Sequence, residues 1–217
     1  MSLAIRPPRR SALGVTWCED FRRGRLGVRK NQGTIMQTPP SVVGFDGKWA
    51  SFPGDADVLI QYPQLRTAGR TAFTAACRTR GVTIVDHQAL ICMYGAVGGD
   101  VFLFDLGSNS KPALHIAISG VTRWVEGAVT DWTVEHDVLV TWSTGDYIRM
   151  YVDGLLSDVS GAAYAGAMDE VAQPLRLGVR NSDDYPLDGD MADPLVDLTR
   201  AWSAAEVMAY HNRSTFI

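Results

Sequence analysis

The sequence contains little cysteine, little histidine and no long apolar run, and each shortage excludes a class of protein. Cysteine occurs three times and histidine four times in 217 residues, and none of them has the spacing of a zinc site. Three widely separated cysteines do not form a disulfide framework, so Cys77 and Cys92, which lie in apolar runs, are expected to be buried thiols. No apolar run approaches the roughly 18 residues of a transmembrane helix, so no membrane insertion is expected.

Two common catalytic patterns are also missing. The sequence has neither the Gly-x-Ser-x-Gly turn of a serine hydrolase nor the glycine-rich loop that binds phosphates. The histidines have no metal-ligand spacing, and His115, within an alternating apolar run, is interpreted as an ordinary strand residue.

What is present is an uneven charge. The whole chain has a net charge of −4, but residues 1–30 carry +6 and the remainder −10. Residues 1–40 also contain two Pro-Pro pairs, so we expect an extended basic N-terminal arm with one early strand near Val15–Trp17. The arm is expected to dock onto an acidic partner through Arg6, Arg9, Arg10, Arg22, Arg23 and Arg25. No specific nucleic-acid partner is expected, since interleaved aromatic residues are lacking; a self-wrapped or solvated arm stays open.

The pattern of residues 41–217 predicts a single β domain. Short apolar runs separated by Gly, Asp, Asn and Pro recur at the spacing of an antiparallel sandwich. The clearest hairpin joins Val138–Trp142 to Ile148–Val152 through a turn that contains Gly145. The expected strands are 42–52, 57–62, 71–78, 89–94, 101–106, 113–118, 137–143, 147–152, 175–180 and 191–198.

One helix is expected, over residues 203–213. Ser203 and Glu206 have the spacing of a capping box, in which the serine hydroxyl accepts from the Glu206 amide and the glutamate reaches back. Trp202 precedes the cap like a hydrophobic staple, and Val207, Tyr210 and His211 share the face expected to lie on the sandwich.

Seven short motifs follow one another in an order that a known family shares. They are Gly33-Thr34, Val43–Gly47, Val58–Ile60, Ile148–Gly154, Pro174–Gly178, Gly189–Asp193 and Trp202–Val207. Over residues 30–213 this order resembles the laminin-G-like, pentraxin-like branch of the concanavalin A-like lectin and glucanase jelly rolls. The resemblance implies an all-β antiparallel sandwich. Pro194 departs from the family pattern and predicts an edge position or a bulge in its strand.

The resemblance also supplies expectations about chemistry. Glycosidases on this scaffold use a Glu-x-Asp-x-x-Glu strand, which begins here at Glu135 and Asp137 but has Val140 at its third position. Because hydrolysis needs both carboxylates, no enzyme is expected, and Glu135 and Asp137 are interpreted as the polar start of a strand. Members that bind calcium hold it at the rim of the sandwich. The acidic loop with the matching oxygen ligands is Asp183, Asp184, Asp188 and Asp190, for which a plain solvated turn is the alternative.

Two aromatic residues are candidates for contact with a glycan or a protein partner. Trp124 lies in a less regular stretch, and Tyr185 interrupts the acidic loop. The tryptophans at 17, 49, 132, 142 and 202 lie in or beside strand and helix patterns and are expected in the core.

Two classes of function remain. A signal-free, disulfide-free sandwich with a basic arm resembles phage virion components, which implies a capsid decoration or tail-associated protein, made in the host cytoplasm and docked to a protein lattice or to further copies of itself. The alternative is a lectin-like module for cell-surface glycans, with calcium optional and no other cofactor.

Overall fold

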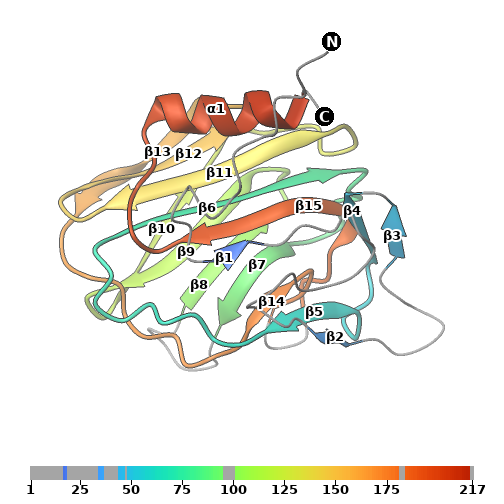
Figure 1. Cartoon of the computed structure of the whole chain (residues 1–217), viewed down its shortest axis with the longest axis horizontal. Coiled ribbons are helices and arrows are strands. Elements are labelled where there is room, and N and C mark those ends of the chain that lie inside the picture. Colours follow the sequence, from blue (N-terminus) through green and yellow to red (C-terminus); the bar gives the residue numbers. More distant parts are fainter. Residues whose placement is uncertain are drawn as a thin grey trace, which may run out of the picture.

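The computed structural model describes residues 17–18, 34–36, 44–46, 48–94, 101–180 and 184–215. Within these residues the chain is an antiparallel β-sandwich with one C-terminal helix, which confirms the predicted fold class (Figure 1). No helix in the described residues is long and apolar enough to cross a membrane.

One layer of the sandwich is an eight-stranded sheet. Its spatial order is β13 (Leu155–Tyr164), β12 (Asp146–Val152), β11 (His136–Ser143), β6 (Ala72–Arg80), β15 (Asp188–Asp197), β4 (Trp49–Pro53) and β3 (Gly44–Asp46). The eighth strand, β1 (Trp17–Cys18), pairs with β15 beside Leu195 and Val196. Every strand pair in this sheet is antiparallel.

The other layer is a seven-stranded sheet, also antiparallel throughout. Its order is β10 (Val121–Glu126), β9 (Pro112–Ile118), β8 (Val101–Leu106), β7 (Gln88–Tyr94), β14 (Leu175–Leu177), β5 (Leu59–Tyr62) and β2 (Thr34–Met36). Strands β1 and β2 come from the first 40 residues, so the segment predicted to be an arm contributes one strand to each sheet.

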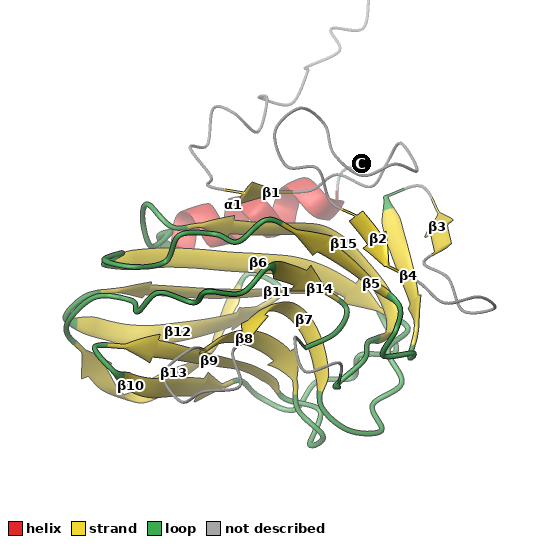
Figure 2. Ribbon diagram, turned by 90° about the horizontal axis from the view of Figure 1, so that it is seen from below, coloured by secondary structure: helices red, strands yellow, loops and turns green. Residues whose placement is uncertain are grey.

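The core fills the space between the two sheets, which Figure 2 shows as two layers. Alternate residues of each strand enter it, as the predicted hairpin illustrates: Val138, Val140 and Trp142 of β11 face Ile148 and Met150 of β12 inside the sandwich. The tryptophans at 49, 132, 142 and 202 are buried as predicted. Cys77 and Cys92 are fully buried free thiols, and burial raises the pKa of the Cys77 thiol.

Pro194 lies at a bulge and not at an edge. Strand β15 is central and pairs with β6 on one side, but the register of that pairing shifts between Ala192 and Leu195. Asp193 has a positive φ of 50° at the same place. Proline has no backbone N–H to donate to a neighbouring strand. The chain accommodates Pro194 at the bulge, where Asp193 and Pro194 are not paired with β6.

Three strands, β2, β10 and β13, were missed by the sequence prediction, and the single strand expected over 42–52 is two strands, β3 and β4. Strands β10 and β13 are the outermost strands of the two sheets, and many of their side chains are exposed on both faces. An edge strand lacks the alternation of buried and polar residues on which the prediction depended. The stretch around Trp124 is therefore a regular strand, and not the irregular segment that we expected.

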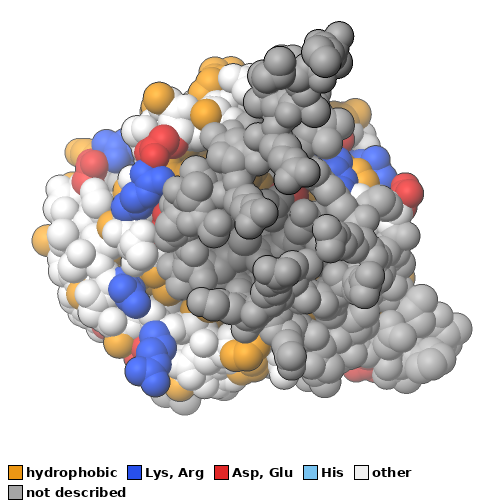
Figure 3. All heavy atoms as spheres, viewed as in Figure 1, with side chains coloured by type: hydrophobic (Ala, Val, Ile, Leu, Met, Phe, Trp, Pro, Cys, Tyr) orange, Lys and Arg blue, Asp and Glu red, His pale blue; other side chains and the backbone are white. Residues whose placement is uncertain are grey.

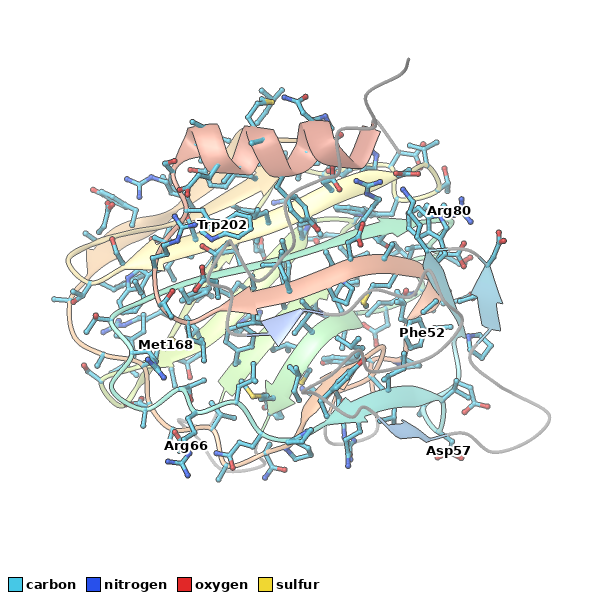
Figure 4. The ribbon with its side chains drawn as sticks, in the orientation of Figure 1. Phe52, Asp57, Arg66, Arg80, Met168 and Trp202 are labelled. Carbon is cyan, nitrogen blue, oxygen red and sulfur yellow. The ribbon has the colours of Figure 1, made fainter. Side chains whose placement is uncertain are left out.

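The C-terminal helix α1 (Ala204–Thr215) begins at the predicted cap. The Ser203 amide donates to Glu206 Oε2 over 2.9 Å, and the Glu206 amide donates to Ser203 Oγ over 3.4 Å. Trp202 and Tyr210 contact each other beneath the helix, where Val207 joins a second apolar cluster on the outer face of the eight-stranded sheet. Figure 4 shows the two ends of this face, with Trp202 near the start of β6 and Arg80 at the end of that strand.

Candidate binding site

A row of directly paired residues crosses the outer face of the seven-stranded sheet. Because side chains alternate between the two faces, these residues point away from the core that their neighbours Leu114 and Ile116 enter. From β5 to β10 the row consists of Gln61, Arg176, Cys92, Leu103, His115 and Trp124.

Trp124 ends this row on the edge strand β10. Its side chain is 54% exposed, whereas Val125 beside it is buried and Arg123 covers the ring of Tyr164 with 4.8 Å between guanidinium and centroid. Three strand spacings separate Trp124 from Cys92, or roughly 14 Å. Trp124 thus offers an exposed aromatic surface at one end of the face, and its role as a contact residue stays a prediction.

Tyr185 lies over the same sheet, toward the other end of the row. It packs on an apolar floor of Ala89, Cys92 and Leu103, and the Ala89 amide donates to the Tyr185 carbonyl over 2.8 Å. The Tyr185 backbone has a φ of 55°, a left-handed conformation that is uncommon for an aromatic residue. The structure therefore holds this second predicted contact residue in place at some conformational cost.

Two further side chains fix the Tyr185 ring. The imidazole of His87 stacks on it with 4.9 Å between centroids and 26° between planes. The guanidinium of Arg180 lies 4.2 Å from the Tyr185 centroid and 4.6 Å from that of Tyr94, and it forms an ion pair with Asp184. We call these five residues, His87, Tyr94, Arg180, Asp184 and Tyr185, the Tyr185 stack.

A buried carboxylate orients the imidazole of this stack. Asp105 lies on β8 with its side chain fully buried, and its Oδ2 is 2.9 Å from His87 Nδ1. This hydrogen bond, with a smaller coulombic attraction, raises the pKa of His87 although partial burial opposes it. The second carboxylate oxygen, Oδ1, is buried without a hydrogen-bond partner in the described residues. His87 therefore gains positive charge more readily than an ordinary histidine.

Taken together, the face combines an exposed indole, a central imidazole at His115 and a fixed stack that carries a guanidinium, a carboxylate and two phenols. An aromatic surface with a few oriented polar groups is the usual composition of a small-molecule or sugar site. The site does not contain a pair of free carboxylates, because Asp105 bonds His87 and Asp184 bonds Arg180.

A second polar cluster lies on the opposite layer, beneath α1. Arg78 is 1% exposed, and it donates from Nε to Asp137 over 2.8 Å and from Nη1 to Glu135 over 2.7 Å. The other oxygen of Asp137 is 2.7 Å from Nδ1 of His211 on α1. Asp137 lies at the start of β11, as expected, and is buried and ion-paired there. The cluster joins the helix to β6 and β11.

This cluster also contains the three potential metal ligands that the described residues bring within 4.8 Å of one another, Asp137, Asp153 and His211. Each already has a protein partner: Asp137 bonds Arg78 and His211, and Asp153 accepts from His136 and from the Asp137 amide. These hydrogen bonds and ion pairs explain the cluster as a structural network, without a metal ion.

The predicted calcium ligands do not form such a group among the described residues. Asp184 pairs with Arg180 beside the seven-stranded sheet, whereas Asp190 accepts from Arg80 Nε over 2.9 Å on the eight-stranded sheet. Asp188 begins β15, and its amide donates to Gln88. Asp183 lies outside the described residues, so calcium stays a prediction.

The arm arginines at 6, 9, 10, 22, 23 and 25 also lie outside the described residues, and their docking role stays a prediction. On the face shown in Figure 3, basic side chains of the described residues are visible at several separate places along the left and right sides.

A hollow of about 720 Å³ lies in the loops at another place in the sandwich. Its carboxylate, Glu170, accepts from the Ala68 amide over 2.8 Å and from the Gln64 side chain. The polar groups of this hollow hold its own loop together, so we regard the face with Trp124 and the Tyr185 stack as the better candidate.

Fold and site together define a jelly-roll-type β-sandwich with a candidate recognition face. No protein-family model and no curated protein matches the sequence. Solved structures match in fold. The binding domain of Paraclostridial Mosquitocidal Protein 1 aligns with a TM-score of 0.72 at 12% identity over 94% of this chain, and the botulinum neurotoxin serotype G binding domain with 0.73 at 11% over 93%.

A Trypanosoma rangeli sialidase, solved in complex with a difluoro nononic acid, aligns with a TM-score of 0.57 at 12% identity over 80% of this chain and 28% of its own. The chain spans about half the length of the two toxin binding domains, 53% and 51%. These likenesses support a jelly-roll sandwich, whereas the laminin-G-like branch and a phage origin find no support in them.

Proposed function

We propose that this protein is a non-catalytic binding module that holds an oligosaccharide on the outer face of its seven-stranded sheet. The observation that carries the proposal is the position of Trp124, 54% exposed and in one cross-strand row with His115 and Leu103, with the Tyr185 stack beyond them. An exposed indole can cover the apolar face of a sugar ring, while Arg180, Asp184 and His115 offer hydrogen bonds to hydroxyl groups.

The length of the face agrees with this ligand class. Trp124 and the floor of the Tyr185 stack are separated by two to three strand spacings, roughly 10–14 Å. A ligand that contacts both ends must therefore be longer than a single sugar ring. The neighbours in fold are named as binding domains and as a sialidase in complex with a sugar acid, which supports a binding role for this scaffold.

A glycan array followed by calorimetry tests the proposal. Once a bound glycan is found, Trp124→Ala and Tyr185→Ala are each expected to raise its Kd by about tenfold or more, because a central aromatic contact typically contributes more than ~1.4 kcal/mol. Tyr147→Ala is the matched control, since Tyr147 is a 41% exposed tyrosine on the other sheet. Running the array with and without a chelator tests the calcium prediction at the same time.

Two results would contradict the proposal. The first is silence across a broad array in both conditions, and the second is a glycan whose affinity is unchanged by Trp124→Ala and Tyr185→Ala.

Attachment to a virion or another protein lattice through the first 40 residues is the second candidate function. It is supported by the net charge of +6 over residues 1–30 against −10 over the remainder. The pairing of β1 and β2 with the chain's own sheets favours the alternative, an arm wrapped on its own sandwich. Replacing the six arginines at 6, 9, 10, 22, 23 and 25 with serine is expected to abolish co-sedimentation with the lattice. Unchanged co-sedimentation would exclude a role for the arm charge.

A further inference from the structure

One end of the sandwich has a strand edge without a partner. Strand β13 is the last strand of the eight-stranded sheet, and within the described residues it pairs with β12 alone. It is ten residues long, so its outer side presents a series of unpaired backbone N–H and C=O groups. Such an edge is a template for a further strand.

Side-chain protection of a free edge is sparse on β13. Natural edge strands carry lysine, proline or several charges that oppose pairing with another chain. In the sequence LLSDVSGAAY the one charged residue is Asp158, and lysine and proline are both missing. The two register shifts in the pairing of β12 with β13 place extra residues in β13, between Val159 and Ala163 and between Leu156 and Asp158, and such bulges bend the strand locally. No further strand of the described residues pairs with β13.

Exposed apolar side chains gather at the same end. The described residues include nine large hydrophobic side chains that are exposed, and seven of them lie on β13, on β10 opposite it, or in the loop between β10 and β11. Five remain when Trp124, which belongs to the candidate binding face, and Val134 are set aside. Strands β10 and β13 contact each other across the end of the sandwich, and the Ala128 amide of that loop donates to Ser157 of β13 over 2.8 Å. We call this surface the β13 edge; its apolar residues are Val121, Val129, Leu155, Leu156 and Val159.

The apolar side chains of the β13 edge lie on both sides of the strand, since Leu155 pairs with Val152 and Leu156 with Tyr151, whose side chains lie on opposite faces of the sheet. With exposed fractions of 40–69%, the five side chains together expose roughly 500 Å². Adding the backbone and the small residues of the strand brings the surface toward the ~800 Å² that each partner of a standard interface buries.

We propose that the β13 edge is the interface of a homodimer, in which two copies of this chain pair their β13 strands antiparallel about a two-fold axis. A two-fold interface needs a surface that is complementary to itself. An antiparallel strand satisfies its own backbone groups in a second copy, and the apolar side chains then meet apolar side chains. Charge does not oppose this arrangement, because the two Asp158 carboxylates come opposite each other only if the axis passes through Asp158 itself.

Light scattering after size-exclusion chromatography of the full chain tests the dimer. The wild type is expected to have twice the mass of one chain, and the double variant Leu155→Lys with Val159→Lys the mass of one chain. Lysine supplies the protection that the edge lacks. Val85→Lys is the matched control, since Val85 is 82% exposed and lies outside the β13 edge; it is expected to stay dimeric.

Amide hydrogen exchange of the wild type keeps the test decisive even if the double variant does not fold. Residues 155–164 are expected to exchange more slowly at high than at low protein concentration. A wild type that is monomeric at high concentration, a folded double variant that stays dimeric, or exchange in β13 that is independent of concentration would each overturn the proposal. Glycan binding is measured separately and is expected to persist in the double variant, because Trp124 and Tyr185 are unchanged.

Discussion

Replacing Arg78 with leucine is expected to lower the free energy of unfolding by about 3–5 kcal/mol, the usual cost of removing one partner of a buried ion pair. Arg78 is 1% exposed and neutralises Asp137, whose side chain is 6% exposed. Without the guanidinium, Asp137 keeps its contact with His211 but loses its main cationic partner in a buried position. Urea unfolding followed by tryptophan fluorescence measures the change.

Two further variants distinguish the effect of leaving a buried charge unpaired from the effect of losing the contacts of an arginine side chain. Arg149→Leu removes a guanidinium that pairs with Asp146 at the surface, where the side chains are 34% and 41% exposed, so it is expected to cost less than about 1 kcal/mol. Combining Arg78→Leu with Asp137→Leu removes both charges and is expected to recover a large part of the stability. If Arg78→Leu costs no more than Arg149→Leu, the cluster beneath α1 does not stabilise the fold.

Replacing Gly178 with alanine is expected to lower the free energy of unfolding by about 2–5 kcal/mol. A left-handed backbone conformation and a steric clash both contribute to this loss. Gly178 has a φ of 84°, and a Cβ atom there would lie 2.4 Å from the ring of Phe52, which Figure 4 labels. The same residue stands between Arg176 and Arg180, and its carbonyl accepts from the Leu187 amide over 2.7 Å. The substitution should therefore also weaken the glycan binding proposed for the Tyr185 stack.

Gly145→Ala is the control that isolates the clash. Gly145 has a nearly equal φ of 81°, but no atom lies within 4 Å of the Cβ position. The Gly145→Ala variant is expected to lose about 1 kcal/mol of its free energy of unfolding, which is the cost of placing alanine in a left-handed backbone conformation. Thermal and urea unfolding of both variants provide the comparison, and equal losses at the two positions would show that Phe52 moves aside without cost.

The candidate site was visible in the sequence only in part. Trp124 and Tyr185 were selected for their aromatic rings. His87 and Asp105 were not, because they lie 98 and 80 positions before Tyr185 in the chain, and Arg180, only five positions before Tyr185, carries no sequence signal of its own. A signal did exist for two of the buried charges. Asp105 interrupts the apolar run VFLFDL, and Arg78 interrupts AFTAACRTR; an isolated charge in such a run needs a buried partner.

Four local features of this protein could be predicted from its residues: the central hairpin, the capping box at Ser203, the buried tryptophans and the irregularity at Pro194. Each depends on residues that are near one another in the chain, so its pattern can be recognised directly. The tertiary structure alone decided that Trp124 and the Tyr185 stack share one face, that Asp137 lies beneath α1, and that β10 and β13 are edges. These features depend on which strands become neighbours, and strand order is set by the packing of the whole core and not by any local run of residues.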